Sequence, residues 1–190
     1  MKTIILVIGP SGSGKTEVAK FIEAHGIPRL GLGDQVREET ARRGLPIITE
    51  NVEATAVQAR KEFGQDIFAK RVLEKALSLP NPVVCIEGAR DTSEVRYLES
   101  HSNFFFVVVK ADPNTRFSRI TARRNTTDPL VTEKDFEVKE KTNVKLGILE
   151  VISYKAPMRF EIQNNGTLEE LKAKVGALVA AIMKGAEGKH

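Results

Sequence analysis

Residues 9–16 read Gly9-Pro10-Ser11-Gly12-Ser13-Gly14-Lys15-Thr16, which fits the pattern G-x-x-x-x-G-K-[ST] at every fixed position. Glycines let the backbone curl so that successive amide hydrogens point at one phosphate, and a helix that begins near Lys15 adds the positive end of its dipole. Lys15 can neutralise the outer phosphates, and the Thr16 hydroxyl can bind Mg²⁺. The segment is therefore predicted to form a phosphate-binding loop for a nucleoside triphosphate.

Around this loop, short apolar runs alternate with helical segments. Runs rich in Ile, Val and Phe predict buried parallel strands at Thr3–Ile8, Val83–Glu87 and Phe104–Val109, and weaker strand signals occur at Arg29–Leu32 and Arg159–Gln163. Helices are expected at 15–24, 34–44 with Asp34 as N-cap, 50–63, 66–78, 92–100, 113–124, 134–151 and 167–183. This order predicts an α/β fold, a three-layer sandwich with helices on both faces of a five-stranded parallel sheet.

Length and composition exclude several classes of protein. A chain of 190 residues, 41% hydrophobic and 28% charged, suits one globular domain, expected here over residues 1–184 with a frayed tail at 185–190. No apolar run approaches the ~20 residues of a membrane span, and the first run lacks a signal-peptide cleavage pattern. One cysteine and three scattered histidines argue against a disulfide and a zinc site, and favour a reducing, cytoplasmic compartment.

Two clusters outside the loop are candidates for a second anion site. Asp34 and Arg37 share one face of a helix start, where a carboxylate can hold a hydroxyl and a guanidinium can clamp a phosphate. Glu87 and Arg90 follow a buried strand at the carboxyl edge of the sheet, where ligands bind in such folds. Glu87 is a candidate magnesium-linked acid. The alternatives are a capped helix with a local ion pair for the first cluster and a solvated loop for the second.

An arginine stripe follows in a later helical segment. Arg116, Arg119 and Arg123 are spaced i, i+3, i+7 and so share one helix face. The stripe suits a lid that closes on transferring phosphates, although a solvated basic face is the alternative. No acidic partner is apparent at helical spacing, so we expect the segment from Arg116 to Val151 to be mobile until phosphates bind.

Together these features resemble the P-loop nucleoside monophosphate kinase superfamily, and most closely short archaeal adenylate-kinase-related proteins, which are also similar to dephospho-coenzyme A kinases. The resemblance covers nearly the whole chain, and it rests on Gly9–Thr16, Gly33-Asp34-x-x-Arg37-Glu38-Glu39, Ala59–Gly64, Glu87-Gly88-x-Arg90-x-x-x-Glu94-Val95, Arg116-Phe117-x-Arg119, Asp128-Pro129 and Asn165–Leu171. It implies a P-loop NTPase sandwich with an acceptor-binding helical insertion at 34–78, a mobile lid at 115–155, and ATP with Mg²⁺ as phosphoryl donor.

The resemblance also implies roles for single residues. Lys15, Arg119 and Arg123 would stabilise charge on the donor phosphates, and Asp34 is the candidate that orients the acceptor. By the same carry-over, Arg37, Arg60 and Arg90 would contact the acceptor phosphate, Thr16 and Glu87 the metal, and Asn164 and Gly166 the surroundings of the adenine. Two departures stand out, because Glu87 occupies a position that is usually Asp, and Lys139-Glu140 replaces a usual Arg-Asp in the lid.

The predicted function is ATP-dependent phosphoryl transfer to a nucleotide or nucleotide-like small molecule, such as an AMP-like monophosphate or a dephospho-coenzyme A-like compound. A nucleotide-binding ATPase or regulatory switch with weak transfer activity is the alternative, and the departures in the lid favour it. The net charge of +4 also permits nucleic-acid binding, but the chain has no recognisable RNA- or DNA-binding motif.

Overall fold

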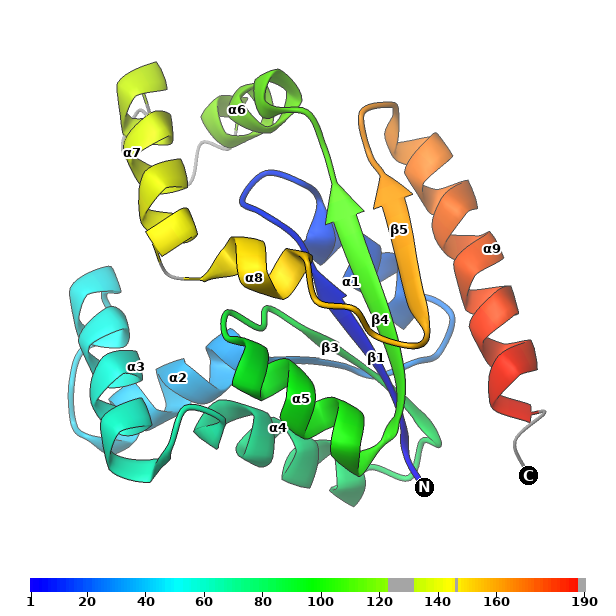
Figure 1. The fold of residues 1–190 in the computed structure, drawn as a ribbon, viewed down its shortest axis with the longest axis horizontal. Helices are drawn as coiled ribbons and strands as arrows, with labels where there is room; N and C mark the ends of the chain where they lie inside the picture. The colour runs from blue at the N-terminus through cyan, green and yellow to red at the C-terminus, as the bar shows by residue number, and fades with distance from the viewer. Residues whose placement is uncertain (123–131, 146, 188–190) are drawn as a thin grey trace.

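Five parallel strands form the centre of the fold, drawn in Figure 1 from the computed structural model, which describes residues 1–122, 132–145 and 147–187. The sheet has the order β2-β3-β1-β4-β5, and every pairing is parallel. The strands are β1 (Thr3–Ile8), β2 (Arg29–Gly31), β3 (Val83–Glu87), β4 (Asn103–Lys110) and β5 (Arg159–Gln163). The predicted five-stranded parallel sheet is confirmed.

Helices cover both faces of the sheet because alternate strand residues point to opposite sides. On one face, Ile5 and Val7 of β1 pack with α1 (Lys15–Glu23) and α9 (Leu168–Glu187). On the other face, Ile4 and Leu6 pack with side chains of five helices. These helices are α2 (Leu32–Arg42), α3 (Thr49–Phe63), α4 (Ile67–Ser78), α5 (Thr92–His101) and α8 (Ile148–Ile152). The remaining helices, α6 (Pro113–Ala122) and α7 (Glu133–Lys145), lie beyond the end of β4 (Figure 1).

Three boundaries differ from the sequence-based expectation. The single helix expected over 134–151 is two helices, because Gly147 adopts a left-handed backbone (φ 85°) at the start of α8. Helix α2 begins at Leu32 after Gly31, so Asp34 lies in its first turn and is not the N-cap. Helix α9 continues to Glu187, past the expected end near Met183 and into the tail expected to fray. Residues 188–190 of that tail lie outside the described residues.

The segment 34–78 contains helices of two kinds. Helix α4 is part of the layer on the sheet, since Phe68, Val72 and Ala76 are fully buried in the core. Helices α2 and α3 extend to the side of the molecule (Figure 1), and α3 buries only Thr55 and Ala59. Helix α3 is therefore the part of the segment that is least buried, whereas α2 adds Leu32 and Val36 to the core.

The chain's single cysteine lies at the middle of the sheet. Cys85 of β3 is paired with Ile5 of β1 on one side and with Arg29 of β2 on the other, and it has no exposed surface. Burial raises the pKa of its thiol well above the usual range. The side chain therefore packs as a small apolar group. Among the described helices, none has the length and apolar composition that crossing a membrane requires.

Candidate functional site

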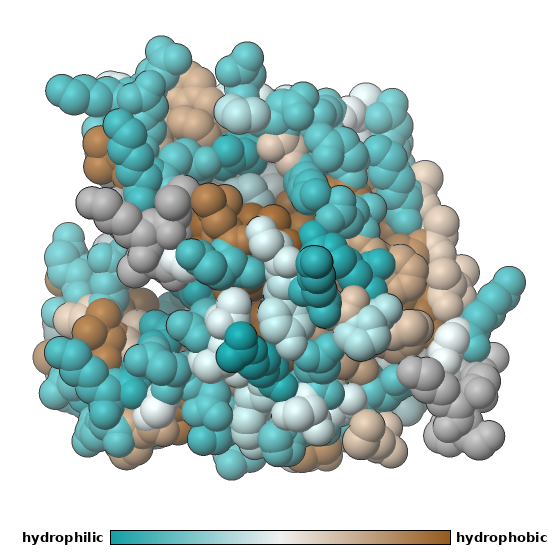
Figure 2. All heavy atoms as spheres, in the orientation of Figure 1, coloured by the Kyte–Doolittle hydropathy of each residue, from teal (hydrophilic) through white to brown (hydrophobic). Residues whose placement is uncertain are grey.

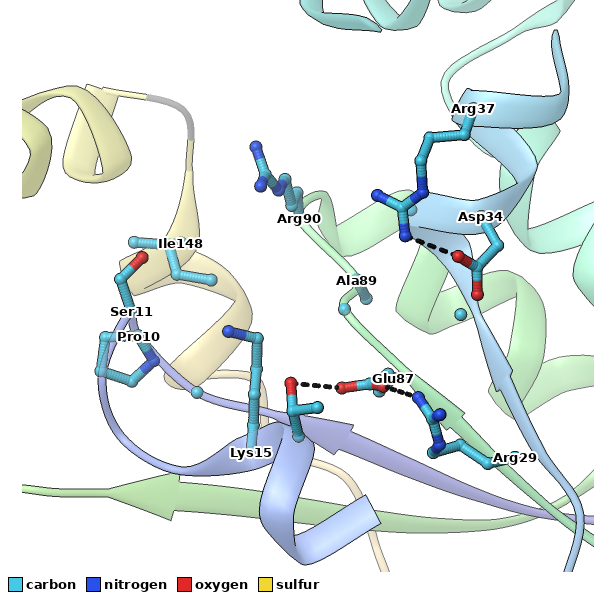
Figure 3. Close-up of a pocket in the computed structure, with 15 residues that line it drawn as sticks. Pro10, Ser11, Lys15, Arg29, Asp34, Arg37, Glu87, Ala89, Arg90 and Ile148 are labelled. Carbon is cyan, nitrogen blue, oxygen red and sulfur yellow. Dashed lines mark hydrogen bonds and ion pairs between the residues drawn. The ribbon is translucent and has the colours of Figure 1, made fainter. Parts of the chain in front are cut away.

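The phosphate loop connects β1 to α1 through a tight turn. The Ser13 amide donates to the Pro10 carbonyl at 3.2 Å, which closes the turn, and α1 begins at Lys15. Gly12 and Gly14 have φ of 77° and 92°, a region that side chains with a Cβ rarely adopt. The backbone therefore requires glycine at positions 12 and 14, and the Lys15 side chain extends into a cavity in front of the loop (Figure 3).

Thr16 and Glu87 are adjacent, as the predicted magnesium site requires. The Thr16 hydroxyl donates to Glu87 Oε2 at 3.0 Å. The register of the sheet pairs Val7 of β1 with Glu87 of β3, so the chain that leads from β1 through the loop to Thr16 starts beside Glu87. Arg29 of β2 donates from Nη1 to the other carboxylate oxygen, Oε1, at 2.6 Å. This hydrogen bond raises the pKa of Arg29 above its ordinary value.

Arg29 was not among the predicted site residues. Arg29 is paired with Cys85, which is two residues before Glu87 on β3. The contact between Arg29 and Glu87 therefore depends on how β2 and β3 pair. A weak strand of three residues does not fix that register in the sequence.

The cavity in front of the loop has a volume of about 320 Å³ and separates the loop from α2 (Figure 3). Asp34 and Arg37 border it on the α2 side, and Arg37 Nη2 donates to Asp34 Oδ1 at 2.5 Å. Arg90, from the loop after β3, lies between α2 and the phosphate loop. Predicted site residues on its lining are Gly9, Pro10, Ser11, Lys15, Thr16, Asp34, Arg37, Glu87 and Arg90.

A second cavity of about 480 Å³ continues from the first beneath α3. The two share four lining residues, among them Arg37 and Arg90. Thr49, Glu53, Arg60 and Glu94 also line the second cavity, and the rest of its lining is apolar, with Leu32, Val36, Ile47, Ile48, Val52, Ala56 and Phe68. Figure 2 shows hydrophobic residues near α3, where Ile47 and Ile48 are more than half exposed. The combined cleft is thus cationic at its centre and apolar at its outer end.

Arg60 of α3 borders the second cavity and is held by a buried carboxylate. Arg60 Nη2 donates to Glu94 Oε1 at 2.9 Å, and the Arg90 amide donates to Glu94 Oε2 at 2.8 Å. Glu94 is 1% exposed, and burial raises the pKa of its carboxyl. The sequence motif included Glu94 without a role, and the structure shows that it joins α3 to the loop that carries Arg90.

The arginines of α6 contact protein groups around the phosphate loop. Arg116 is 6% exposed and forms an ion pair with Glu140 of α7 at 2.6 Å. No acidic partner was expected at helical spacing, and the partner of Arg116 lies 24 residues away, on another helix. Arg119 Nη1 donates to the Asn164 carbonyl at 2.8 Å and Nη2 to the Gly166 carbonyl at 3.3 Å. Arg123 lies outside the described residues.

Asn164 is buried beside the loop. Its side-chain amide donates to the Ser13 carbonyl at 2.8 Å, which places Asn164, Gly166 and Arg119 together on the side of the loop away from Glu87. Asn164 and Gly166, the residues predicted to surround the adenine, thus both accept hydrogen bonds from Arg119. Within the described part of the chain, no group of three or more His, Cys, Asp or Glu side chains could hold a metal.

Comparison with known proteins places the chain in a family. A family model described as an AAA domain matches residues 5–140. UPF0200 protein TK1334 of Thermococcus kodakarensis is 40% identical over 185 residues, which cover 95% of this chain and 98% of the relative. The UPF0200 protein of Hyperthermus butylicus is 34% identical, over 95% of each chain. The chain belongs to the UPF0200 family.

Solved structures similar to this UPF0200 protein include two small-molecule kinases. A gluconokinase from Sinorhizobium meliloti 1021 aligns with a TM-score of 0.61 and 18% identity, over 100% of this chain and 98% of its own. A shikimate kinase from Acinetobacter baumannii, in complex with shikimate, aligns with a TM-score of 0.55 and 21% identity, over 95% and 94%. At these identities the likeness is one of fold, and the resemblance to the P-loop kinase superfamily is confirmed at that level.

Proposed function

We propose that this UPF0200 protein is a P-loop small-molecule kinase, which transfers the terminal phosphoryl group of ATP to a nucleotide or nucleotide-like acceptor. The observation that carries the proposal is that one cavity has the phosphate loop with Lys15 on one side and Arg37 and Arg90 on the other. Two sets of anion-binding groups that face each other suit a donor and an anionic acceptor, because phosphoryl transfer requires mainly positioning and neutralisation of charge.

The donor half would consist of the loop amides, Lys15, Thr16 and Glu87. Mg²⁺ is usually held by one or two carboxylates, phosphate oxygens and water, and the Thr16–Glu87 contact of 3.0 Å supplies a hydroxyl and a carboxylate at one point. These residues fit the ion. When bound, Mg²⁺ would neutralise charge on the outer phosphates, and Lys15 would stabilise the charge that develops there during transfer.

The acceptor half would be the second cavity with its arginines. Arg37, Arg60 and Arg90 suit a phosphate, and the apolar lining beneath α3 suits a base or another apolar body. An acceptor oxygen attacks the γ-phosphorus, the bond to the bridging oxygen breaks, and ADP leaves. A hydroxyl acceptor, as in a dephospho-coenzyme A-like compound, would pass its proton to Asp34, whereas the phosphate of an AMP-like acceptor needs no base.

A second candidate function is acceptor-independent ATP hydrolysis that serves as a switch. It is favoured by Arg116 and Arg119, because the guanidinium groups of these two residues of the predicted lid donate hydrogen bonds to protein groups. In this case the predicted lid helices would report the nucleotide state of the loop.

Measurement of ADP formation separates the two functions. Purified protein receives ATP and Mg²⁺ alone, then with nucleoside monophosphates or dephospho-coenzyme A. The kinase proposal expects ADP formation that depends on one class of acceptor, and Lys15→Ala should lower that rate by roughly 100-fold or more. ADP formation at the same rate without any acceptor would reject the kinase in favour of the switch.

A further inference from the structure

Two carbonyl oxygens of the phosphate loop accept hydrogen bonds from side chains outside the loop. The Ser11 carbonyl accepts from Arg116 Nη1 at 3.2 Å, and the Ser13 carbonyl accepts from Asn164 Nδ2 at 2.8 Å. Arg116 comes from α6, and Asn164 follows β5, so two distant parts of the chain meet at the loop. Neither contact involves Lys15 or Thr16, to which the proposed function assigns the phosphate chemistry.

These contacts orient the amides that would bind phosphate. The N–H and C=O of a trans peptide point in opposite directions, and the described chain has no cis peptide. Because the Ser11 carbonyl points at Arg116, the Gly12 N–H points away from Arg116. In the same way, the Ser13 carbonyl points at Asn164, and the Gly14 N–H points away from Asn164. Both peptide units precede a glycine with positive φ, where rotation meets the least steric resistance. An external donor is needed to keep them in one orientation.

The two donors are themselves held in place. Arg116 forms its ion pair with Glu140, and its guanidinium lies 5.4 Å from the centre of the Phe136 ring, also on α7. A Cβ at Gly12 would lie 2.7 Å from the Arg116 carbonyl oxygen, so loop and helix are in close contact. Asn164 is fixed by Arg119, which donates to its backbone carbonyl at 2.8 Å.

We propose that Arg116 and Asn164 are positioning residues that set the phosphate affinity of the loop by fixing the Ser11–Gly12 and Ser13–Gly14 peptide units. Glu140 acts through Arg116, so the affinity of the loop depends on the position of α7. The inference rests on the donor half of the proposed function and does not require transfer to an acceptor.

The test measures binding of inorganic tripolyphosphate by titration calorimetry, since this ligand needs only the donor half. Arg116→Met and Asn164→Leu should each weaken binding about tenfold, the effect of losing one hydrogen bond to a phosphate-binding unit. Arg71→Met is the matched control. Arg71 also pairs with a buried glutamate, Glu39 at 2.7 Å, and lies 5.6 Å from a Phe ring, but it is on α4. Arg71→Met should lower the Tm and leave the affinity unchanged.

Glu140→Gln distinguishes positioning from simple electrostatics. Loss of a negative charge near the loop should tighten binding of an anion if only charge matters, whereas a released Arg116 should weaken it. In the ¹H–¹⁵N spectrum, the Gly12 amide should shift in Glu140→Gln and the Gly14 amide in Asn164→Leu, and neither should shift in Arg71→Met. Glu140→Gln and Asn164→Leu keep the inference testable even if Arg116→Met fails to fold.

The outcomes separate the inference from the proposed function. Unchanged tripolyphosphate affinity in the Arg116 and Asn164 variants, or tighter binding by Glu140→Gln, would overturn the inference alone. A wild-type protein that binds neither tripolyphosphate nor ATP would overturn the donor site and the inference with it. A wild-type protein that binds both but transfers to no acceptor would contradict the kinase proposal and leave the inference standing.

Discussion

Glu87 uses both carboxylate oxygens, one for the Thr16 hydroxyl and one for Arg29. In the resembling kinases this position is usually Asp, and the extra methylene made the geometry of a metal site at Glu87 uncertain from sequence. The ion pair with Arg29 holds the longer side chain against Thr16. Its side chain is 12% exposed, so solvent weakens this pair less than a surface ion pair.

Glu87→Gln is expected to remove most of the gain in ATP affinity that Mg²⁺ provides, because a neutral amide does not balance the charge of the ion. ATP affinity in excess chelator should change little. Calorimetry with Mg²⁺ and with chelator gives the two values. Glu23→Gln is the control, since Glu23 also pairs with Arg29, at 3.4 Å, but is about half exposed. An undiminished effect of Mg²⁺ in Glu87→Gln would show that this carboxylate does not serve the metal.

Arg37→Ala is expected to weaken acceptor binding by about ten- to a hundredfold, the value of one or two charge-assisted hydrogen bonds, and to leave ATP affinity unchanged. Arg37 and Asp34 are both about half exposed, so loss of their ion pair should barely change the Tm. Titration with each ligand alone decides. Arg42→Ala, on the same helix and away from the cleft, is the control. Equal losses for both ligands would remove Arg37 from the acceptor site.

Helices α2 and α4 are joined by one buried carboxylate. Glu39 of α2 is 4% exposed and accepts hydrogen bonds from Arg42, Arg43 and Arg71, the last on α4. Arg43 also donates to Glu62 of α3 at 2.7 Å. Burial raises the pKa of Glu39, but hydrogen bonds from Arg43 and Arg71 outweigh it, and the net pKa lies below the ordinary value.

Glu39→Gln should therefore lower the free energy of unfolding by roughly 2–4 kcal/mol at pH 7. A carboxyl with a lowered folded pKa stabilises the fold above its unfolded pKa of about 4.3, and this contribution is lost as pH falls through the folded pKa. The difference between wild type and variant should shrink in acid, as urea unfolding at pH 7 and at lower pH would show. Glu62→Gln, at an exposed position, should cost under about 1 kcal/mol. A difference independent of pH would contradict this account.

Helices α6 and α7 should respond differently to ligand. Arg116 and Arg119 already bind the loop and the Asn164–Gly166 turn, so α6 should be protected from hydrogen exchange without ligand. Helix α7 is held to α6 by the Arg116–Glu140 pair and by Phe136 against Phe117, with ring centres 5.5 Å apart. A bisubstrate analogue should increase protection in α7 more than in α6, whereas equal gains in both would favour closure of the two helices together.

The sequence predicted the strands well because buried parallel strands are continuous apolar runs that need no knowledge of their partners. It missed the break at Gly147, since an isolated glycine in a charged helical segment costs only ~1 kcal/mol and does not by itself end a helix. The left-handed turn there accompanies the packing of Val151 on the sheet, which is a tertiary effect.

The candidate site likewise has a local part, which the sequence predicts, and a part made by tertiary contacts, which it does not. The phosphate loop is local, so residues 9–16 could be identified from spacing alone. The contacts of Arg29 with Glu87, Arg60 with Glu94 and Arg116 with Glu140 join residues 58, 34 and 24 positions apart. Such distances exceed any helical or strand period, so only the folded chain reveals which charges meet.

Across the molecule, strand order determines where the two cavities lie. Strands β1 and β3 are neighbours, so the phosphate loop after β1 and the Glu87–Arg90 loop after β3 leave the sheet at the same edge. Helix α2 starts directly after β2, the next strand, and places Arg37 on the far side of the cleft. Ligands in open α/β sheets bind at this carboxyl edge, and here three adjacent strands supply the charged groups.

The buried thiol of Cys85 provides a way to follow ligand binding without knowing the reaction. A thiol reagent reaches the centre of the sheet only in molecules that have opened, so the rate of labelling measures how often the fold opens. A ligand that binds the folded state alone slows that rate in proportion to its occupancy. A library of phosphorylated metabolites could thus be ranked by labelling kinetics alone, and the compound that protects Cys85 best in the presence of ATP would be the first acceptor to assay.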